Sequence, residues 1–136
     1  MDVVDDLLSV RGMTPQKLER LRDFLTTRGD GCININAAPK LVIESLAEAM
    51  DATLAQTIIR RRETKRFEDI TELRDVPGMT DNIYNTIKDL ITVDSAERYY
   101  RVQAQASVAE RQCHVEAILR RNTEAGNVDI ILYRES

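Results

Sequence analysis

Two nearly identical pentapeptides could bind a phosphate group. Val-Arg-Gly-Met-Thr occupies positions 10–14 and Val-Pro-Gly-Met-Thr occupies 76–80, and each precedes a helical apolar pattern. Backbone N–H groups at the start of a helix attract anions. Gly12 and Gly78 permit a turn that a residue with a Cβ resists. Because similar residues recur elsewhere at the same offset of 66, each copy is typical of a helix-hairpin-helix unit.

The residues around the turns argue against this chemistry. Phosphate-binding hairpins usually have a second glycine two positions after the first, where this chain has Thr14 and Thr80. Threonine caps a helix, and its side chain competes for the same N–H groups. The net charge of −4 is also opposite to that of most phosphate-binding proteins. We therefore expect Gly12, Thr14, Gly78 and Thr80 to form structural hairpin turns, with a nucleic-acid-binding module as the alternative.

The other reactive side chains form no familiar constellation. Arg60-Arg61-Arg62, followed by Lys65 and Arg66, is interpreted as a solvated helix end, where cations suit the helix dipole. His114 alternates with apolar residues and has no partners at zinc-ligand spacing. There is no glycine-rich phosphate loop, no Gly-x-Ser-x-Gly motif and no Cys–His pair with a supporting acid. The sequence therefore predicts a protein that is not an enzyme.

The cysteines and the hydropathy of the sequence do not determine the cellular compartment of the protein. Cys32 and Cys113 are either two ordinary, partly buried thiols or a disulfide between the halves of the chain, and spacing alone does not decide. No apolar run reaches the length of a membrane-spanning helix, and the N-terminus is acidic, unlike a signal peptide. The sequence fits either a cytosolic protein or a fragment that lacks its targeting region.

Helical periodicity extends from the N-terminus to about residue 93. Four apolar stripes are expected to form helix faces, and they are Leu18, Leu21, Phe24 and Leu25; Leu41, Val42, Leu46 and Met50; Leu54, Ile58 and Ile59; and Ile83, Ile87, Leu90 and Ile91. The expected helix starts are Thr14 with Pro15, Pro39, Asp51, Asp69 or Thr71, and Thr80. Gly29 and Gly31 are expected to end the first of these helices.

From about residue 97 the apolar period becomes two, which predicts a three-stranded antiparallel meander. We expect a three-residue turn around Glu110 and a polar loop over 122–127. The fold class is therefore α+β, with a helical region over 1–95 and a sheet over 96–136. One face of this sheet is apolar and needs a cover. Either the helical half folds over it, or the cover lies in a segment absent from this chain.

The order of the motifs resembles the general secretion pathway protein K family, the large minor pseudopilin of type II secretion systems. The resemblance covers nearly the whole chain, and the residues that carry it are LLSVRGMTPQKLERLRDFLT at 7–26, Ile33-Asn34-Ile35-Asn36-Ala37-Ala38, Arg62, Phe67, Ile70, Leu73, Val76-Pro77-Gly78-Met79, Leu90-Ile91-Thr92-Val93, Ser95 and the strand at 99–108. Single pieces such as Val-Pro-Gly-Met are common. Their order, ending in a meander, is more specific.

This resemblance implies a SAM-like helical insertion within a pilin-like sheet. Family members have an N-terminal hydrophobic helix that is cleaved by a prepilin peptidase, and in pilin folds this helix covers the apolar sheet face. They act at the pseudopilus tip with two other minor pseudopilins, with cargo and the outer-membrane channel as further candidate partners. The implied location is the periplasmic side of the inner membrane of a Gram-negative bacterium.

Two implications of the resemblance stay open. Calcium has a place in the family, but no ligand residue can be assigned here. The chain lacks the membrane helix and the first part of the pilin domain, so it is either a piece of a longer protein or a natural short form. In the first case, the helix that covers the sheet would lie in the part not included.

Overall fold

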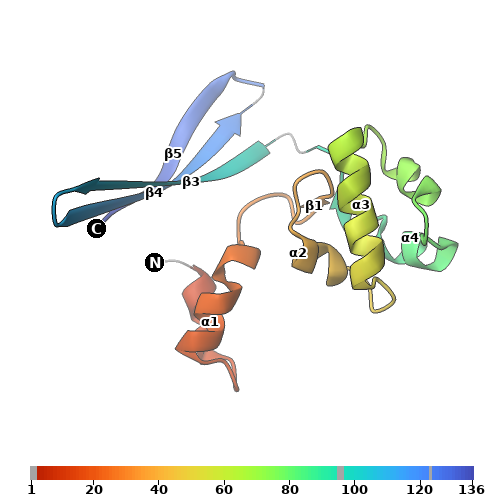
Figure 1. Cartoon of the computed structure of the whole chain (residues 1–136), viewed down its shortest axis with the longest axis horizontal. Coiled ribbons are helices and arrows are strands. Elements are labelled where there is room, and N and C mark those ends of the chain that lie inside the picture. Colours follow the sequence, from red (N-terminus) through yellow and green to blue (C-terminus); the bar gives the residue numbers. More distant parts are fainter. Residues whose placement is uncertain (1–2, 95–96, 123) are drawn as a thin grey trace. The chain divides into compact units, whose positions relative to one another are not determined.

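The structure, a computed structural model, describes residues 3–94, 97–122 and 124–136. Contacts divide the chain into a helical unit within residues 1–27 and 31–94 and a sheet unit within residues 28–30 and 95–136 (Figure 1). The expected domain boundary at 95/96 and Ser95 of the family signature lie outside the described residues. Each unit is described by itself.

The helical unit is made of short helices and one small parallel strand pair. In chain order its elements are the 3-10 helix η1 (Val3–Ser9), α1 (Pro15–Leu21), η2 (Arg22–Phe24), β1 (Ile33–Asn34), α2 (Lys40–Glu44), α3 (Ala52–Thr64), η3 (Ile70–Asp75), α4 (Asp81–Ile87) and β2 (Ile91–Thr92). Most of these helices are too short to be stable in isolation, so tertiary packing must hold them.

The predicted helix caps are confirmed at three positions. The side chains of Thr14, Asp51 and Thr80 accept hydrogen bonds from backbone N–H groups in the first turns of α1, α3 and α4. Of the two candidates for the next short helix, Asp69 is the cap, and with Glu72 it forms a reciprocal capping box. Local side-chain chemistry therefore fixes where these helices begin.

Three helix boundaries differ from the expectation. The first helix ends with η2 at Phe24, so Gly29 and Gly31 lie beyond its end. Pro39 is the N-cap of α2, and the helix begins at the next residue. Ile91 is not helical: it pairs with Ile33 in the parallel β1·β2 ladder, because the chain becomes extended after α4. This two-stranded contact was not predicted.

The core of the helical unit is one continuous cluster around α3. Its buried members are Ile35, Ala38, Ile43, Leu46, Met50, Leu54, Ala55, Ile58, Phe67, Leu73, Val76, Ile83, Tyr84, Ile87 and Ile91. Four residues assigned to the predicted helix faces are instead exposed, and these are Leu21, Phe24, Leu41 and Leu90. The stripe on α3 was therefore right. The second and fourth stripes were right except at Leu41, Leu90 and the non-helical Ile91, and in the first stripe Leu18 alone is buried.

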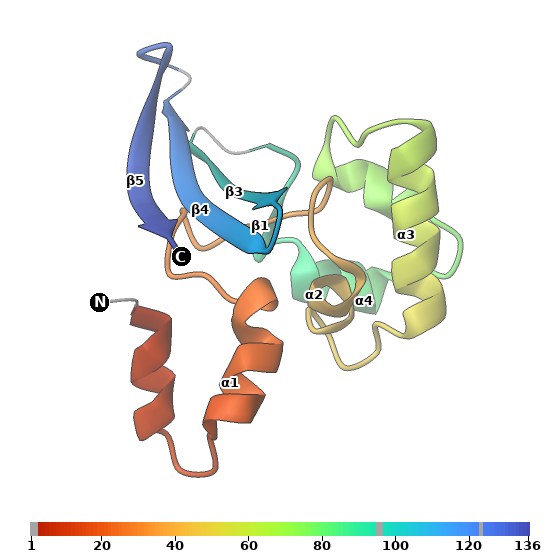
Figure 2. The same ribbon diagram turned by 60° about the vertical axis from the view of Figure 1, so that its left-hand side comes forward.

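The sheet unit is a three-stranded antiparallel meander of β3 (Glu97–Val108), β4 (Arg111–Asn122) and β5 (Asn127–Glu135), in the order β3-β4-β5 (Figure 2). The α+β class is thereby confirmed. Val108 pairs with Arg111, so the first connection has two residues, and not three. Ala109 has a positive φ of 54°, which suits a tight hairpin turn. The register shifts near Ile118 and Leu119, where β4 meets β5.

Candidate functional site

The first glycine turn is closed by its own side chains. Gly12 has a φ of 90°, and the Met13 N–H donates to the Val10 carbonyl at 3.0 Å. The Lys17 N–H donates to Thr14 Oγ1 at 3.2 Å. The ammonium of Lys17 donates to the Gly12 carbonyl at 2.8 Å. The cation nearest to the helix start is thus directed to the turn itself.

The second turn has the same backbone arrangement. Gly78 has a φ of 92°, and the Met79 N–H donates to the Val76 carbonyl at 2.9 Å. The Ile83 N–H donates to Thr80 Oγ1 at 3.2 Å. Here the surroundings differ, because a Cβ on Gly78 would lie 3.5 Å from Leu54 Cδ1, whereas nothing lies within 4 Å of the corresponding point at Gly12. The second turn packs on the core.

The arginine-rich end of α3 is only partly solvated, which corrects the sequence interpretation. Arg62 donates to the carbonyls of Ile35 and Ala38 at 2.9 and 2.8 Å. Arg61 pairs with Glu72 at 3.1 Å, and its guanidinium lies 5.2 Å from the centre of the Phe67 ring. Partial burial lowers the pKa of Arg62, with the neighbouring Glu63 charge opposing the shift. The side chains of Arg61 and Arg62 therefore connect α3 to other segments of the chain.

Asn36 joins three segments that are far apart in the sequence. Its carboxamide oxygen accepts from the Phe67 N–H at 2.9 Å, and its nitrogen donates to the carbonyls of Phe67 and Val93 at 2.9 and 2.8 Å. Asn34 positions it by accepting from the Asn36 N–H at 2.9 Å. The sequence marked Asn36 only as part of a motif. A single amide can replace the backbone pairing of an extended strand, and no sequence period reports such a contact.

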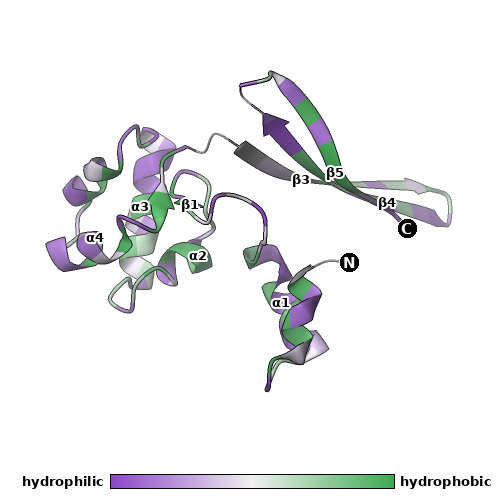
Figure 3. Ribbon diagram, turned by 180° about the vertical axis from the view of Figure 1, so that it is seen from behind, coloured by the Kyte–Doolittle hydropathy of each residue, from purple (hydrophilic) through white to green (hydrophobic). Residues whose placement is uncertain are grey.

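One face of the sheet is apolar and exposed. Opposite residues in an antiparallel sheet share a face. The register gives one face an apolar set, which we call the apolar face: Tyr100, Val102, Ala104, Ala106, Val108, Cys113, Val115, Ala117, Leu119, Val128, Ile130 and Tyr133. It places the charged Arg111, Arg121 and Glu135 on the same side of the sheet. All six exposed large hydrophobic residues of the sheet unit belong to the apolar face. Figure 3 shows the alternation of hydrophobic and hydrophilic residues along β5.

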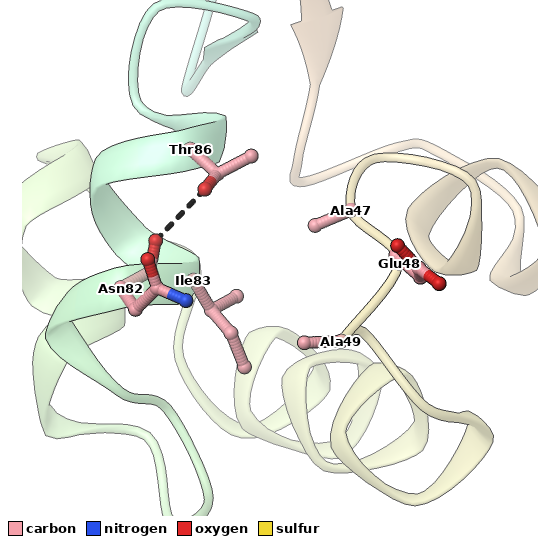
Figure 4. A pocket seen from close by; sticks show the side chains of 6 residues that line it. All are labelled: Ala47, Glu48, Ala49, Asn82, Ile83 and Thr86. Carbon is pink, nitrogen blue, oxygen red and sulfur yellow. Dashed lines mark hydrogen bonds between the residues drawn. The ribbon is translucent and has the colours of Figure 1, made fainter.

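A shallow pocket on the helical unit offers little chemistry. It has a volume of about 400 Å³ and is lined by Ala47, Glu48, Ala49, Asn82, Ile83 and Thr86 (Figure 4). The Thr86 hydroxyl donates to the Asn82 carbonyl within α4. Glu48 is the single ionisable residue in the lining, so no acid–base pair is assembled there.

Two further features concern residues 3–94, 97–122 and 124–136, which the structure describes. Within those ranges no three His, Cys, Asp or Glu side chains gather where they could hold a metal ion. In the same ranges, no helix is both long and apolar enough to cross a bilayer.

The structure is thus of the α+β class, and the contacts described for the capped turns, Asn36 and the arginines of α3 all lie within the chain. Comparison with known proteins identifies a family that part of the chain resembles. Residues 33–94 match the family model described as type II secretion system (T2SS), protein K, which confirms the resemblance for this segment. No curated protein and no solved structure matches the chain. The matched segment makes up somewhat less than half of the chain.

The matched segment clarifies what the family signature does in this chain. Asn36, Arg62 and Phe67 all take part in the hydrogen bonds and ring contact that join the loop before α2 to α3 and the segment after it. Leu73, Val76 and Ile91 are core residues. The signature is therefore a folding signature, and the residues that contact partners must be sought on the surface.

Proposed function

We propose that this protein works at the pseudopilus tip, where it supports pseudopilus assembly and protein export through contacts with the other minor pseudopilins. The protein K match supports membership of the secretion machinery. The observation that carries the contact role is the apolar face, which leaves six large hydrophobic side chains exposed. Exposed apolar patches of this kind are typical of protein–protein contact surfaces. Secreted cargo and the outer-membrane channel are further partners in this proposal.

The proposed location is the periplasm, with attachment to the inner membrane through an N-terminal helix. In a pilin-like sheet, such a helix covers the apolar face, and this would satisfy the need of a three-stranded sheet for an apolar cover. We further propose that each glycine turn with its two helices is a helix-hairpin-helix unit of a SAM-like domain. In this proposal Gly12, Thr14, Gly78 and Thr80 are structural residues of the hairpins.

The experiment is a binding titration with the other two minor pseudopilins from the same organism. We expect a saturable complex that Ile130→Lys weakens, because the variant places a charge on the apolar face, where Ile130 is 67% exposed. His114→Lys is the matched control, since His114 lies on the opposite face of the sheet. Absence of binding, including in a form that carries the N-terminal helix, would contradict the proposal.

The alternative function is nucleic-acid binding by the paired hairpins. Both turns do have the positive φ glycine that brings backbone N–H groups near a ligand. However, the threonine side chains already accept hydrogen bonds from N–H groups at the start of both helices. Asp81 also adds a negative charge in the first turn of α4, beside the N–H groups that would bind a phosphate there. A gel shift over a range of salt concentrations separates the two functions, because phosphate contacts strengthen as salt falls. Binding at low salt would favour the alternative.

A further inference from the structure

The chain contains a single peptide bond that joins an aspartate or asparagine to a glycine. Of its five glycines, Gly31 alone follows such a residue, Asp30. In an Asp–Gly pair the glycine nitrogen can attack the carboxyl carbon of the aspartate and close a five-membered ring, because an intramolecular reaction of well-placed groups needs no encounter step. Glycine favours this attack, since it has no Cβ to crowd the ring. The sequence therefore contains the atoms of one internal reaction.

The structure places this bond in an exposed loop. The preceding helix η2 ends at Phe24 and β1 begins at Ile33, and Asp30 and Gly31 are both exposed. Gly29 and Gly31, on the two sides of Asp30, have positive φ values of 112° and 84°. Apart from the chain neighbours, no atom of the described residues lies within 4 Å of the point where a Cβ would stand on either glycine. Packed atoms therefore do not confine the backbone rotation that ring closure requires.

Asn34 and Asn36 lie a few residues further on and provide a contrast. The nitrogen after Asn34 belongs to Ile35, which is fully buried and donates its N–H to a carbonyl of β2 at 2.9 Å. The nitrogen after Asn36 belongs to Ala37 and donates to the Asn34 carbonyl at 3.1 Å. Attack by either nitrogen would break a backbone hydrogen bond of the folded chain. The same reaction at the two asparagines therefore requires local opening of the β1 region.

We propose that Asp30–Gly31 is a site of spontaneous isomerisation, at which aspartate converts to isoaspartate through a cyclic imide. The Gly31 nitrogen forms a bond to Cγ of the protonated Asp30 carboxyl group. The bond between Cγ and the hydroxyl oxygen breaks, and the hydroxyl leaves with the amide proton as one water molecule. One water then adds to the imide. Opening of the bond from nitrogen to Cγ restores aspartate, whereas opening of the bond to the main-chain carbonyl carbon gives isoaspartate.

The product differs from the parent chain in its backbone. The main chain of isoaspartate passes through Cβ and Cγ, so it gains one carbon between η2 and β1, and the free carboxylate moves to the α position. The change lies before the matched segment 33–94, in an exposed loop, so we expect the core of the helical unit to stay folded. The reaction uses only atoms of this loop and water, and the proposal does not depend on the secretion function or on a binding partner.

Incubation of the folded chain in heavy-oxygen water tests the proposal. Each passage through the imide inserts one heavy oxygen atom into the carboxylate, whichever bond opens. Trypsin cleavage after Arg28 and Lys40 releases one peptide that contains Asp30, Asn34 and Asn36. Fragmentation of this peptide in a mass spectrometer locates the label, and electron-transfer fragmentation distinguishes isoaspartate from aspartate. We expect labelled isoaspartate at position 30, and unlabelled amide side chains at positions 34 and 36.

Two substitutions at the same residue are matched controls. Asp30→Glu keeps the negative charge but would have to close a larger ring, so labelling at position 30 should fall about tenfold or more. Asp30→Asn should form the same imide with release of ammonia, and so should yield a mixture of aspartate and isoaspartate at this position. Undiminished labelling in Asp30→Glu would show that the heavy oxygen enters by another route and would overturn the proposal.

The unfolded chain provides the control for the loop geometry. The same incubation in guanidinium chloride measures the reaction when no structure restrains the backbone. We expect the folded chain to be labelled at position 30 at a rate comparable with that of the unfolded chain, whereas Asn34 and Asn36 should react only when the chain is unfolded. Absence of label at position 30 in the folded chain, with or without label in the unfolded chain, would contradict the assignment. Equal labelling of all three positions in the folded chain would also contradict it.

Discussion

The two glycine turns share a backbone and differ in their surroundings. Gly12 and Gly78 have φ values of 90° and 92°, and threonine caps the next helix in both copies. Yet Val10 is 53% exposed where Val76 is 3% exposed, and Leu21 is 40% exposed where Ile87 is fully buried. The turn is thus set by local chemistry, whereas burial depends on what the rest of the chain supplies.

The core that covers the second copy comes from the segment between the two copies. Leu54 and Ile58 of α3 belong to the same buried cluster as Val76 and Ile87. Val4 and Leu18 of the first copy are buried but lie outside this cluster. A repeated sequence therefore does not guarantee a repeated structural role, and paired substitutions can measure the difference.

The largest effect is expected from the paired core substitutions Ile87→Ala and Leu21→Ala. Ile87→Ala should lower the free energy of unfolding by about 2–5 kcal/mol, because it leaves a cavity in a packed core. Leu21→Ala should cost less than about 1 kcal/mol, since the side chain is partly solvated. Urea denaturation followed by circular dichroism measures both. Equal losses would mean that the first copy is buried in solution.

Asn36→Ala should be next in size, at about 2–3 kcal/mol of unfolding free energy. The change removes the three hydrogen bonds to Phe67 and Val93 and leaves their backbone groups in need of new partners. Asn36→Asp is the informative companion, because it keeps an acceptor and loses the donors. If alanine were tolerated without loss in denaturant melts, the role assigned to Asn36 would be wrong.

Alanine at the two glycines should cost about 1–2 kcal/mol each, because a positive φ strains any residue with a Cβ. The difference between Gly12→Ala and Gly78→Ala should be only a few tenths of a kcal/mol, since the 3.5 Å approach to Leu54 is an ordinary contact. Hydrogen exchange of the flanking amides reports each hairpin separately. A far larger loss at Gly78 would show that close packing, and not backbone strain, dominates there.

The smallest expected effect is a loss of folding stability at acid pH, and it should be confined to the second copy. Hydrogen bonds from the Glu68 and Asp69 N–H groups lower the pKa of Glu72 below its ordinary 4.5, and bonds from Thr71 lower the pKa of Asp69 below 3.8. Carboxylates with lowered folded-state pKa values stabilise the fold above their unfolded pKa, and this contribution is lost as pH falls through the folded value.

Glu72→Gln should therefore flatten the dependence of stability on pH below about 4.5. The equivalent position in the first copy is Asp6, for which Asp6→Asn serves as the control. Thermal melts between pH 2.5 and 6 measure both. An equal flattening in the control would show that acid sensitivity is not specific to the capping box.

The sequence predicted the features that depend on neighbours along the chain. Thr14, Asp51 and Thr80 cap helices because a hydroxyl or carboxylate reaches N–H groups three residues away, and the meander follows from an apolar period of two. It did not predict the β1·β2 pair, since Ile33 and Ile91 are far apart and each strand has only two residues. No period can develop over that length.

The hydrogen-bond partners of the charged residues were also hard to predict, because a sequence pattern does not show which distant groups a long side chain reaches. Arg62 looked like part of a solvated run, yet its guanidinium reaches carbonyls at Ile35 and Ala38. Lys17 is a cation in the first turn of α1, and it donates to the Gly12 carbonyl within the turn. A charge pattern locates the cationic residues but does not identify the groups that they contact. The role of each cation therefore depends on the three-dimensional structure.

The central claim is that both glycine turns hold helices together and do not bind phosphate. Amide chemical shifts in an NMR titration with a short DNA duplex at low salt test it most directly. The account predicts that the amides of Lys17 and Ile83 do not shift, because threonine side chains already accept from them. Saturable shifts at both amides, weakening as salt is added, would contradict it.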